Sequence, residues 1–127
     1  MNGKAIVATC LIILAAGCSR EMKKEYYPDG KLKAVLNYKK GKLDGLVQYY
    51  YENGNLKERA NYRNGKRERV STTYYEDGNL KEEINYAGGK REGLTRIYDE
   101  DGRLFGEAEY RNDQRISEKK LISPDES

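Results

Sequence analysis

A repeat of 24 residues runs through most of this chain and constrains its fold more than any other feature. Glycines recur at steps of 24, and a leucine and a tyrosine follow each glycine at fixed offsets. The three columns are Gly30, Gly54, Gly78 and Gly102; Leu32, Leu56, Leu80 and Leu104; and Tyr38, Tyr62, Tyr86 and Tyr110. Several columns in register without a gap indicate tandem duplication of one structural unit.

Each glycine of the first column predicts a tight turn between two strands. Glu52, Asn53 and Gly54 occupy the same phase as Pro28, Asp29 and Gly30. Because proline holds φ at about −65°, Pro28 excludes a type I′ turn. A type I turn followed by a glycine in the left-handed conformation accommodates Pro, Asp and Gly in that order. We therefore predict this turn in all four copies, with Gly30, Gly54, Gly78 and Gly102 as the structural turn residues.

This turn also predicts the register of the hairpin and its two faces. The predicted pairs are Tyr50 with Leu56, Gln48 with Glu58, and Leu46 with Ala60. Side chains of a strand alternate between faces, so an antiparallel sheet covered on one side has one apolar and one polar face. In the second repeat the predicted apolar face carries Leu46, Tyr50, Leu56, Ala60 and Tyr62.

The repeats together predict an all-β fold. Second turns at Gly41, Gly65 and Gly89 join one hairpin to the next, so tandem 24-residue β-hairpins form one continuous antiparallel meander of about eight strands. Four repeats are expected over residues 22–116. Residues 117–127 are expected to form a C-terminal cap, as a strand or a short helical turn, followed by a disordered tail.

The first 17 residues predict a lipoprotein signal peptide. Lys4 is their only charge, and a run of 12 mostly apolar residues from Ala5 to Ala16 is too short to span a bilayer comfortably. The run ends in Leu14-Ala15-Ala16-Gly17-Cys18, which resembles a bacterial lipobox. The resemblance implies removal of residues 1–17, a diacylglyceryl group on Cys18 and a lipidated tether over residues 18–21. The alternative is an ordinary secreted protein with an unmodified cysteine.

The residues after the lipobox suggest where the mature protein resides. Ser19 beside Cys18 resembles the pattern that permits sorting to the outer membrane in diderm bacteria. With so short a tether, the domain is expected to rest close to the lipid headgroups. Arg20, Lys23 and Lys24 are candidates for contact with anionic lipid. The alternative is that these side chains are solvated charges.

The residue inventory argues against an enzyme, a metal site and a cofactor other than the covalent lipid on Cys18. The chain has no histidine, and processing would leave no thiol beside Cys18. Asp99 and Asp101 superficially resemble a calcium loop, but its first and twelfth positions would be Ile97 and Ala108, which favours a plain turn. The 24 basic and 21 acidic residues are interspersed, which argues against a nucleic-acid partner.

One candidate ligand face lies on the polar side of the predicted sheet. Its members recur once per hairpin and are Tyr27, Tyr51, Tyr75, Lys33, Lys57 and Lys81. Rings aligned in this way could stack on glycan rings or receive a peptide. The alternative, which we favour, is that the rings shield the turns and pair with one another across strands.

The repeat unit resembles the bacterial variant of the MORN repeat over roughly residues 22–115. The shared pattern is aromatic-x-x-Asp/Asn-Gly-x-Leu, with the aromatic residue three places before Asp/Asn, followed after five residues by Tyr-x-x-Gly-Lys. The resemblance implies a non-catalytic hairpin sheet that serves as a scaffold or binding surface. In other MORN proteins the proposed ligands are membranes or partner proteins, and many bacterial relatives of the variant type carry an antitoxin label.

These observations combine into one expected function and two alternatives. We expect an envelope protein held to the membrane by its lipid, which binds a protein partner or a second copy of itself. The first alternative is an antitoxin or immunity protein that occludes a toxin. The second is a glycan-binding envelope protein.

Overall fold

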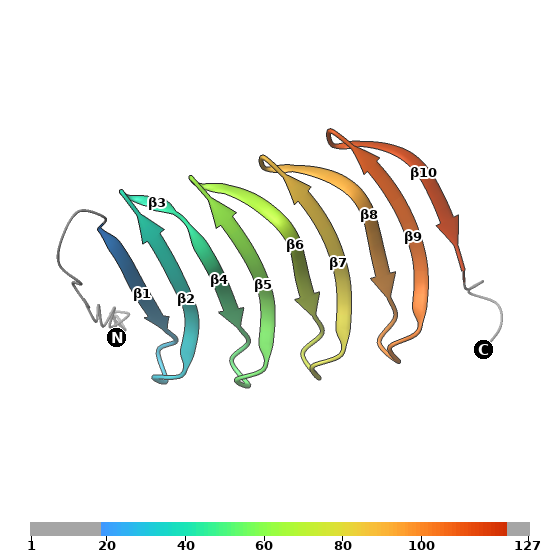
Figure 1. Cartoon of the computed structure of the whole chain (residues 1–127). Helices are drawn as coiled ribbons and strands as arrows, with labels where there is room; N and C mark the ends of the chain where they lie inside the picture. Colours follow the sequence, from blue (N-terminus) through green and yellow to red (C-terminus); the bar gives the residue numbers. More distant parts are fainter. Residues whose placement is uncertain (1–18, 122–127) are drawn as a thin grey trace.

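The computed structural model describes residues 19–121 as one antiparallel sheet of ten strands (Figure 1). The strands are β1 (Arg20–Tyr26), β2 (Leu32–Lys39), β3 (Lys42–Leu43), β4 (Gly45–Tyr50), β5 (Leu56–Arg63), β6 (Lys66–Tyr74), β7 (Leu80–Ala87), β8 (Lys90–Tyr98), β9 (Leu104–Arg111) and β10 (Gln114–Lys120). Their order in the sheet follows the chain, with the short β3 paired to β2. The predicted all-β meander is confirmed. The predicted signal peptide, the lipidation of Cys18 and the end of the predicted tail lie outside the described residues.

Strands β1, β2 and β4 to β9 correspond to the eight that the repeats predict, and the short β3 and the terminal β10 are additional. β1 begins at Arg20, so Arg20 and Glu21 lie in the sheet. β10 follows the last repeat and pairs with β9, which corresponds to the strand form of the expected cap. Within residues 19–121 there is no helix long and apolar enough to cross a membrane.

The glycine turns have the predicted geometry. Gly54 has a φ of 90°, its N–H donates to the Tyr51 carbonyl oxygen at 2.9 Å, and the N–H of Tyr51 donates to the carbonyl oxygen of Asn55 at 2.8 Å. Gly30, Gly78 and Gly102 have similar positive φ values. These four turns lie along one edge of the sheet, at the bottom of Figure 1, which we call the first-turn edge.

Replacing Gly54 by alanine is expected to lower the free energy of unfolding by about 1 kcal/mol, since an L side chain disfavours positive φ. The added Cβ would meet nothing within 4 Å, so the cost is conformational and not steric. Urea unfolding of the variant measures it. Glu52→Ala, an exposed change in the same turn, is the control, and equal stability of the two variants would contradict the assigned turn.

The opposite edge of the sheet carries turns of a different type. Both central residues have positive φ in Lys40-Gly41, Asn64-Gly65, Gly88-Gly89 and Asn112-Asp113, which is the signature of a type I′ turn. We call this the second-turn edge, at the top of Figure 1. The last three of these turns are each tied to the turn region before them, because the N–H groups of Gly65, Gly89 and Asp113 donate to the carbonyl oxygens of Leu43, Arg67 and Arg91 at 2.8, 2.9 and 3.0 Å.

A bulge beside each glycine turn changes the register that we predicted. Tyr50 opposes Leu56 as expected, but Tyr49 opposes Glu58, so Lys57 is an extra residue in β5. The predicted pairs of Gln48 with Glu58 and Leu46 with Ala60 are therefore wrong: the partners are Arg59 and Asn61, and Ala60 lies opposite Val47. An extra residue in one strand shifts every later pair by one position. The same shift occurs between β1 and β2, β6 and β7, and β8 and β9.

The shift divides the predicted apolar face between the two sides of the sheet. Val47 is fully buried, whereas Leu46 is only partly buried and Val70, one repeat after Leu46, is 40% exposed. The buried side chains lie on one side, which we call the inner face, and are Ala34, Leu36, Val47, Ala60, Ser71, Thr95 and Ala108. Most of them are small. The strands of this single layer are bowed (Figure 1), and partly buried tyrosines such as Tyr38, Tyr49 and Tyr62 pack against the buried aliphatic cluster.

Candidate functional site

The three tyrosines of the predicted ligand face form a ladder that joins successive hairpins. The hydroxyl of Tyr27 donates to the Tyr50 carbonyl oxygen at 2.6 Å. The hydroxyls of Tyr51 and Tyr75 donate in the same way to the carbonyl oxygens of Tyr74 and Tyr98, at 2.7 and 2.9 Å. Each hydroxyl therefore bonds to backbone one repeat further along the chain.

The lysines of the predicted ligand face lie over the rings of this ladder. The Nζ atoms of Lys33, Lys57 and Lys81 are 5.8, 5.3 and 5.3 Å from the ring centroids of Tyr27, Tyr51 and Tyr75. These distances suit cation–π contacts. The structure thus pairs each predicted lysine with the predicted tyrosine of its own hairpin, and each tyrosine is bonded to the next hairpin.

The ladder ends where the repeats end. In the fourth copy Asp99 occupies the position of Tyr27, Tyr51 and Tyr75. Phe105 occupies the position of Lys33, Lys57 and Lys81. Asp99 Oδ1 accepts the N–H of Arg103 within its own turn at 2.8 Å, and the Nζ of Lys120 lies 5.4 Å from the Phe105 ring. No later hairpin in the described part of the chain presents a carbonyl that a tyrosine at position 99 would reach.

Asparagine side chains tie the turns of the first-turn edge together. The Nδ2 atoms of Asn53 and Asn55 both donate to the Glu76 carbonyl oxygen at 2.8 Å, and Asn79 Nδ2 donates to the Glu100 carbonyl oxygen at 2.8 Å. Neighbouring turns therefore hold one another at a fixed spacing.

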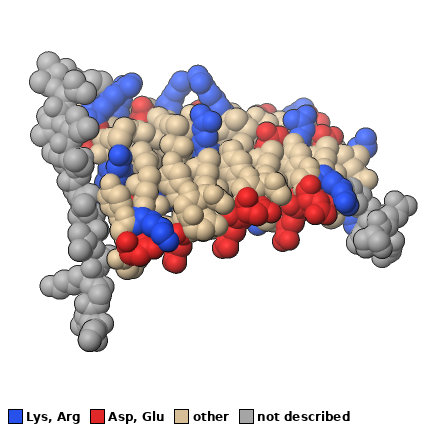
Figure 2. All heavy atoms as spheres, turned by 90° about the horizontal axis from the view of Figure 1, so that it is seen from below, with Lys and Arg blue, Asp and Glu red and all other residues tan. Residues whose placement is uncertain are grey.

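An open depression of about 390 Å³ lies on this edge across three successive turns, lined by Tyr51, Tyr75, Glu76, Asp77 and Glu100. Figure 2 views the molecule from this side and shows Asp and Glu side chains gathered in a row. Burial raises the pKa of the Tyr75 hydroxyl, and the nearby negative charges, first that of Glu100, raise it further. Aromatic surface beside carboxylates suits a cationic group, and a carboxylate or phosphate would be repelled.

A column of carboxylates on the second-turn edge supports the turns, a role that the sequence-based expectations did not include. Asp44 Oδ2 accepts the N–H of Asn64 at 3.2 Å, Glu68 Oε1 that of Gly88 at 3.0 Å, and Glu92 Oε2 that of Asn112 at 2.7 Å. The signal was present, since the three acids recur at 24-residue steps, each three residues after a second-turn glycine. Each carboxylate supports the turn of the next hairpin.

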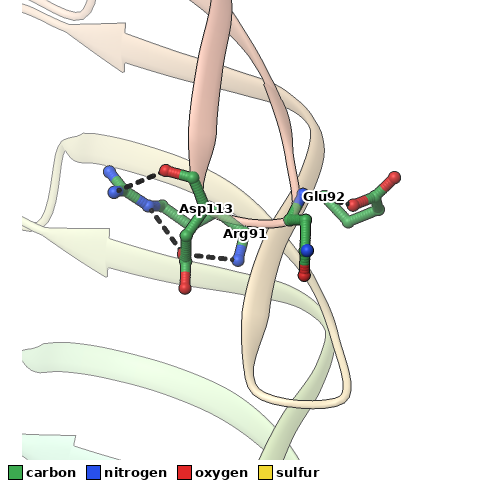
Figure 3. A network of polar contacts seen from close by, with 4 residues as sticks. Arg91, Glu92 and Asp113 are labelled. Carbon is green, nitrogen blue, oxygen red and sulfur yellow. Dashed lines mark hydrogen bonds and ion pairs between the residues drawn. The ribbon is translucent and has the colours of Figure 1, made fainter.

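The last turn of this edge is held by Arg91 and Asp113 (Figure 3). Asp113 stands where the earlier turns have glycine and has a φ of 68°. Its Oδ1 accepts the N–H of Arg91 at 2.9 Å and the Nε–H of the same arginine at 3.3 Å. These bonds, the backbone one first, hold the pKa of the Asp113 carboxyl below its usual value. The last turn thus replaces a glycine with a side chain that anchors it to β8.

A second stack of aromatic and basic side chains crosses the inner face. The Arg67 guanidinium lies 5.8 Å from the centroid of the Tyr62 ring and 5.4 Å from that of the Tyr86 ring, and it forms an ion pair with Glu58. The guanidinium of Arg91 lies 4.2 Å from the Tyr110 ring. Arg67 of β6 therefore joins its hairpin to the preceding one through Tyr62 and Glu58 of β5, whereas Arg91 of β8 contacts Tyr110 of β9 within one hairpin.

The second-turn edge also carries exposed basic side chains and the start of the sheet. The exposed residues are Arg20, Lys40, Lys42, Arg63, Lys66, Lys90 and Arg111. The backbone N–H of Lys40 donates to the Ser19 carbonyl oxygen at 3.3 Å, which holds the residue before β1 beside the first turn of this edge. The two edges of one sheet therefore differ in charge.

Asp99 and Asp101, the residues that resemble a calcium loop, are engaged within the last glycine turn. Arg103 donates its backbone N–H to Asp99 and forms an ion pair with Asp101 at 3.6 Å. Across residues 19–121 there is no group of three or more His, Cys, Asp or Glu side chains placed to hold a metal ion.

Comparison with known proteins identifies the repeat. No curated protein and no solved structure matches the chain. The family model described as "MORN repeat variant" matches four segments, residues 23–40, 43–64, 70–87 and 91–112, which together cover more than half of the chain. Each segment spans one hairpin, in part or whole, with its glycine turn, and the segment 43–64 also includes the last residue of β3. Four consecutive hairpins with this pattern, joined by the ladders described above, show that the chain belongs to the MORN repeat variant family.

Proposed function

We propose that this protein is a lipoprotein of the bacterial cell envelope, at the outer membrane if the host is diderm, whose repeat sheet is a non-catalytic scaffold for a protein partner. The observation that carries the proposal is the lipobox-like segment that ends at Cys18, and the position of Ser19 indicates how closely the anchor would join the sheet. Ser19 is the residue directly after the cysteine that ends the lipobox-like segment, and its carbonyl oxygen accepts the N–H of Lys40. A lipid on Cys18 would then be joined to the folded sheet with almost no linker.

The arrangement of the sheet supports binding to a protein. Its side chains are repeated at regular steps, and the turns are tied to their neighbours by the tyrosine, asparagine and carboxylate contacts. A surface whose parts do not rearrange on binding loses little conformational entropy in a complex. The depression beside Tyr51 and Tyr75 would accept a lysine or arginine side chain of such a partner.

Metabolic labelling with a clickable palmitate analogue tests the anchor. The wild-type chain and a Cys10→Ser variant are expected to incorporate the label, because Cys10 lies in the predicted leader. A Cys18→Ser variant is expected to lose it. Absence of label in the wild type, or label retained by the Cys18→Ser variant, would refute the lipoprotein assignment.

Photocrosslinking in cells tests the scaffold. A photoreactive amino acid at Glu76, on the first-turn edge, is expected to capture one discrete protein, whereas the same amino acid at Arg59, within β5, serves as the control. A partner that contacts the depression should also be lost when Glu76, Asp77 and Glu100 are replaced by glutamine or asparagine. Equal capture from both positions would argue against the first-turn edge as the binding surface.

A further inference from the structure

We infer that the second-turn edge rests against anionic phospholipid headgroups, so that the sheet stands edge-on to the membrane with its first-turn edge pointing away. The inference rests on the proposed lipid anchor at Cys18. It adds to that proposal the orientation of the domain and the chemistry of the surface that it contacts.

The start of the sheet determines which edge is nearest to the lipid. Successive Cα atoms are about 3.8 Å apart, so the Cα of Cys18 lies within about 4 Å of that of Ser19. Ser19 is held at the second-turn edge by the N–H of Lys40, and Arg20 pairs with Lys39 at the same end of β2. β1 then runs away from this edge and ends at Tyr26, next to the first glycine turn. Acyl chains on Cys18 would enter the bilayer beside the second-turn edge.

The charges of the two edges favour the same orientation. The first three second turns are each followed directly by an exposed lysine, at Lys42, Lys66 and Lys90. The acids of this edge include Asp44, Glu68 and Glu92, which accept backbone N–H groups of the turns, and they are fewer than the exposed lysines and arginines. An anionic leaflet attracts basic residues that lie within a Debye length of it.

The first-turn edge lacks this basic excess. Its exposed acids are Asp29, Glu52, Glu76, Asp77, Glu100 and Asp101, and Figure 2 shows the acidic row on this side. Its exposed basic residues are Lys31, Lys33, Lys57, Lys81 and Arg103, of which Lys31 and Arg103 form ion pairs with Asp29 and Asp101. Of the basic residues that the sequence suggested for lipid contact, only Arg20 lies on the second-turn edge. Lys23 and Lys24 lie within β1, opposite Leu36 and Val35, and Lys23 forms an ion pair with Glu25 at 3.4 Å.

Fluorescence quenching from labelled positions on the two edges tests the orientation. The lipidated chain is reconstituted in phosphatidylcholine vesicles with about 30% phosphatidylglycerol and a spin-labelled headgroup quencher. Once the leader is removed and Cys18 is acylated, a single introduced cysteine is the only free thiol. A fluorophore at Ala87→Cys, exposed beside the Gly88-Gly89 turn, is expected to be quenched several-fold more than one at Glu52→Cys on the opposite edge.

Two charge-reversal triples separate headgroup contact from the effect of the anchor alone. Lys42→Glu, Lys66→Glu and Lys90→Glu together are expected to abolish the difference in quenching, while the protein still floats with the vesicles. The matched triple of Lys31→Glu, Lys57→Glu and Lys81→Glu, on the first-turn side, should preserve the difference. Circular dichroism confirms that both triples are folded.

Each result supports or overturns the inference. Equal quenching from both edges, or a difference that persists in the first triple and in phosphatidylcholine alone, would overturn the headgroup contact and leave the anchor standing. A wild-type chain that does not float with the vesicles would overturn the anchor, and the orientation with it.

Discussion

Replacing Val47 by aspartate is expected to unfold much of the sheet, whereas the same change at the neighbouring Leu46 should be tolerated. Val47 is 0% exposed, lies opposite Ala60 on the inner face and belongs to the cluster of buried aliphatic residues. A buried carboxylate without a partner costs about 3–5 kcal/mol, which is a large part of the stability of a small domain. The side chain of Leu46 lies on the other face and is partly exposed, so a loss of about 1 kcal/mol is expected there.

This pair of variants also tests the bulge. The sequence-based register placed Leu46 opposite Ala60 on the apolar face, and the bulge at Lys57 brings Val47 there instead. Urea unfolding monitored by circular dichroism gives the free energy of unfolding of each variant. A greater loss for Leu46→Asp than for Val47→Asp would show that the hairpin has the register without the bulge.

Removing the three ladder hydroxyls together is expected to lower the free energy of unfolding by about 3 kcal/mol. Tyr27→Phe, Tyr51→Phe and Tyr75→Phe each delete one hydrogen bond to a backbone carbonyl in the next repeat, and each such bond contributes about 1 kcal/mol net. The three bonds join different pairs of hairpins. In a repeat protein such nearest-neighbour contributions are approximately additive.

The comparison of single and triple variants by urea unfolding measures this ladder. Tyr50→Phe is a matched control, because Tyr50 takes part in the ladder through its carbonyl oxygen, which the substitution retains. If the triple variant were as stable as the wild type but lost a binding partner, Tyr27, Tyr51 and Tyr75 would form a ligand face and not a structural ladder. A loss of stability with binding retained would support the ladder as a structural element.

The turns show how far residue types alone specify this fold. Pro28 excludes a type I′ turn in the first copy, and the common Asp/Asn-Gly pattern extends the resulting type I turn to the others; the φ values of Gly30, Gly54, Gly78 and Gly102 agree. Even Arg69, which breaks a column otherwise occupied by Gly45 and Gly93, adopts their left-handed conformation with a φ of 63°. Backbone conformation in these turns is a local property, so a single repeat contains the information for it.

Contacts between repeats were harder to predict. Tyr51 and Lys57 were recognised as neighbours, but the acceptor of the hydroxyl, the Tyr74 carbonyl oxygen, lies in another hairpin. In the sequence Glu68 cannot be distinguished from a solvated acid, but in the structure its carboxylate accepts the N–H of Gly88. A periodic column shows that a residue has the same role in each copy, and only the relative position of two hairpins shows which atom it contacts.

The sequence by itself determined the repeat length, the glycine turns, the antiparallel meander and the place where the array ends, because each depends on local backbone preferences or on the period. The tertiary structure alone decided which side chains are buried, since one bulge residue per hairpin moves Val47 and not Leu46 to the inner face. It also decided that the start of β1 lies on the second-turn edge, because the direction of the first strand and the hydrogen bond between Ser19 and Lys40 depend on how the hairpins assemble.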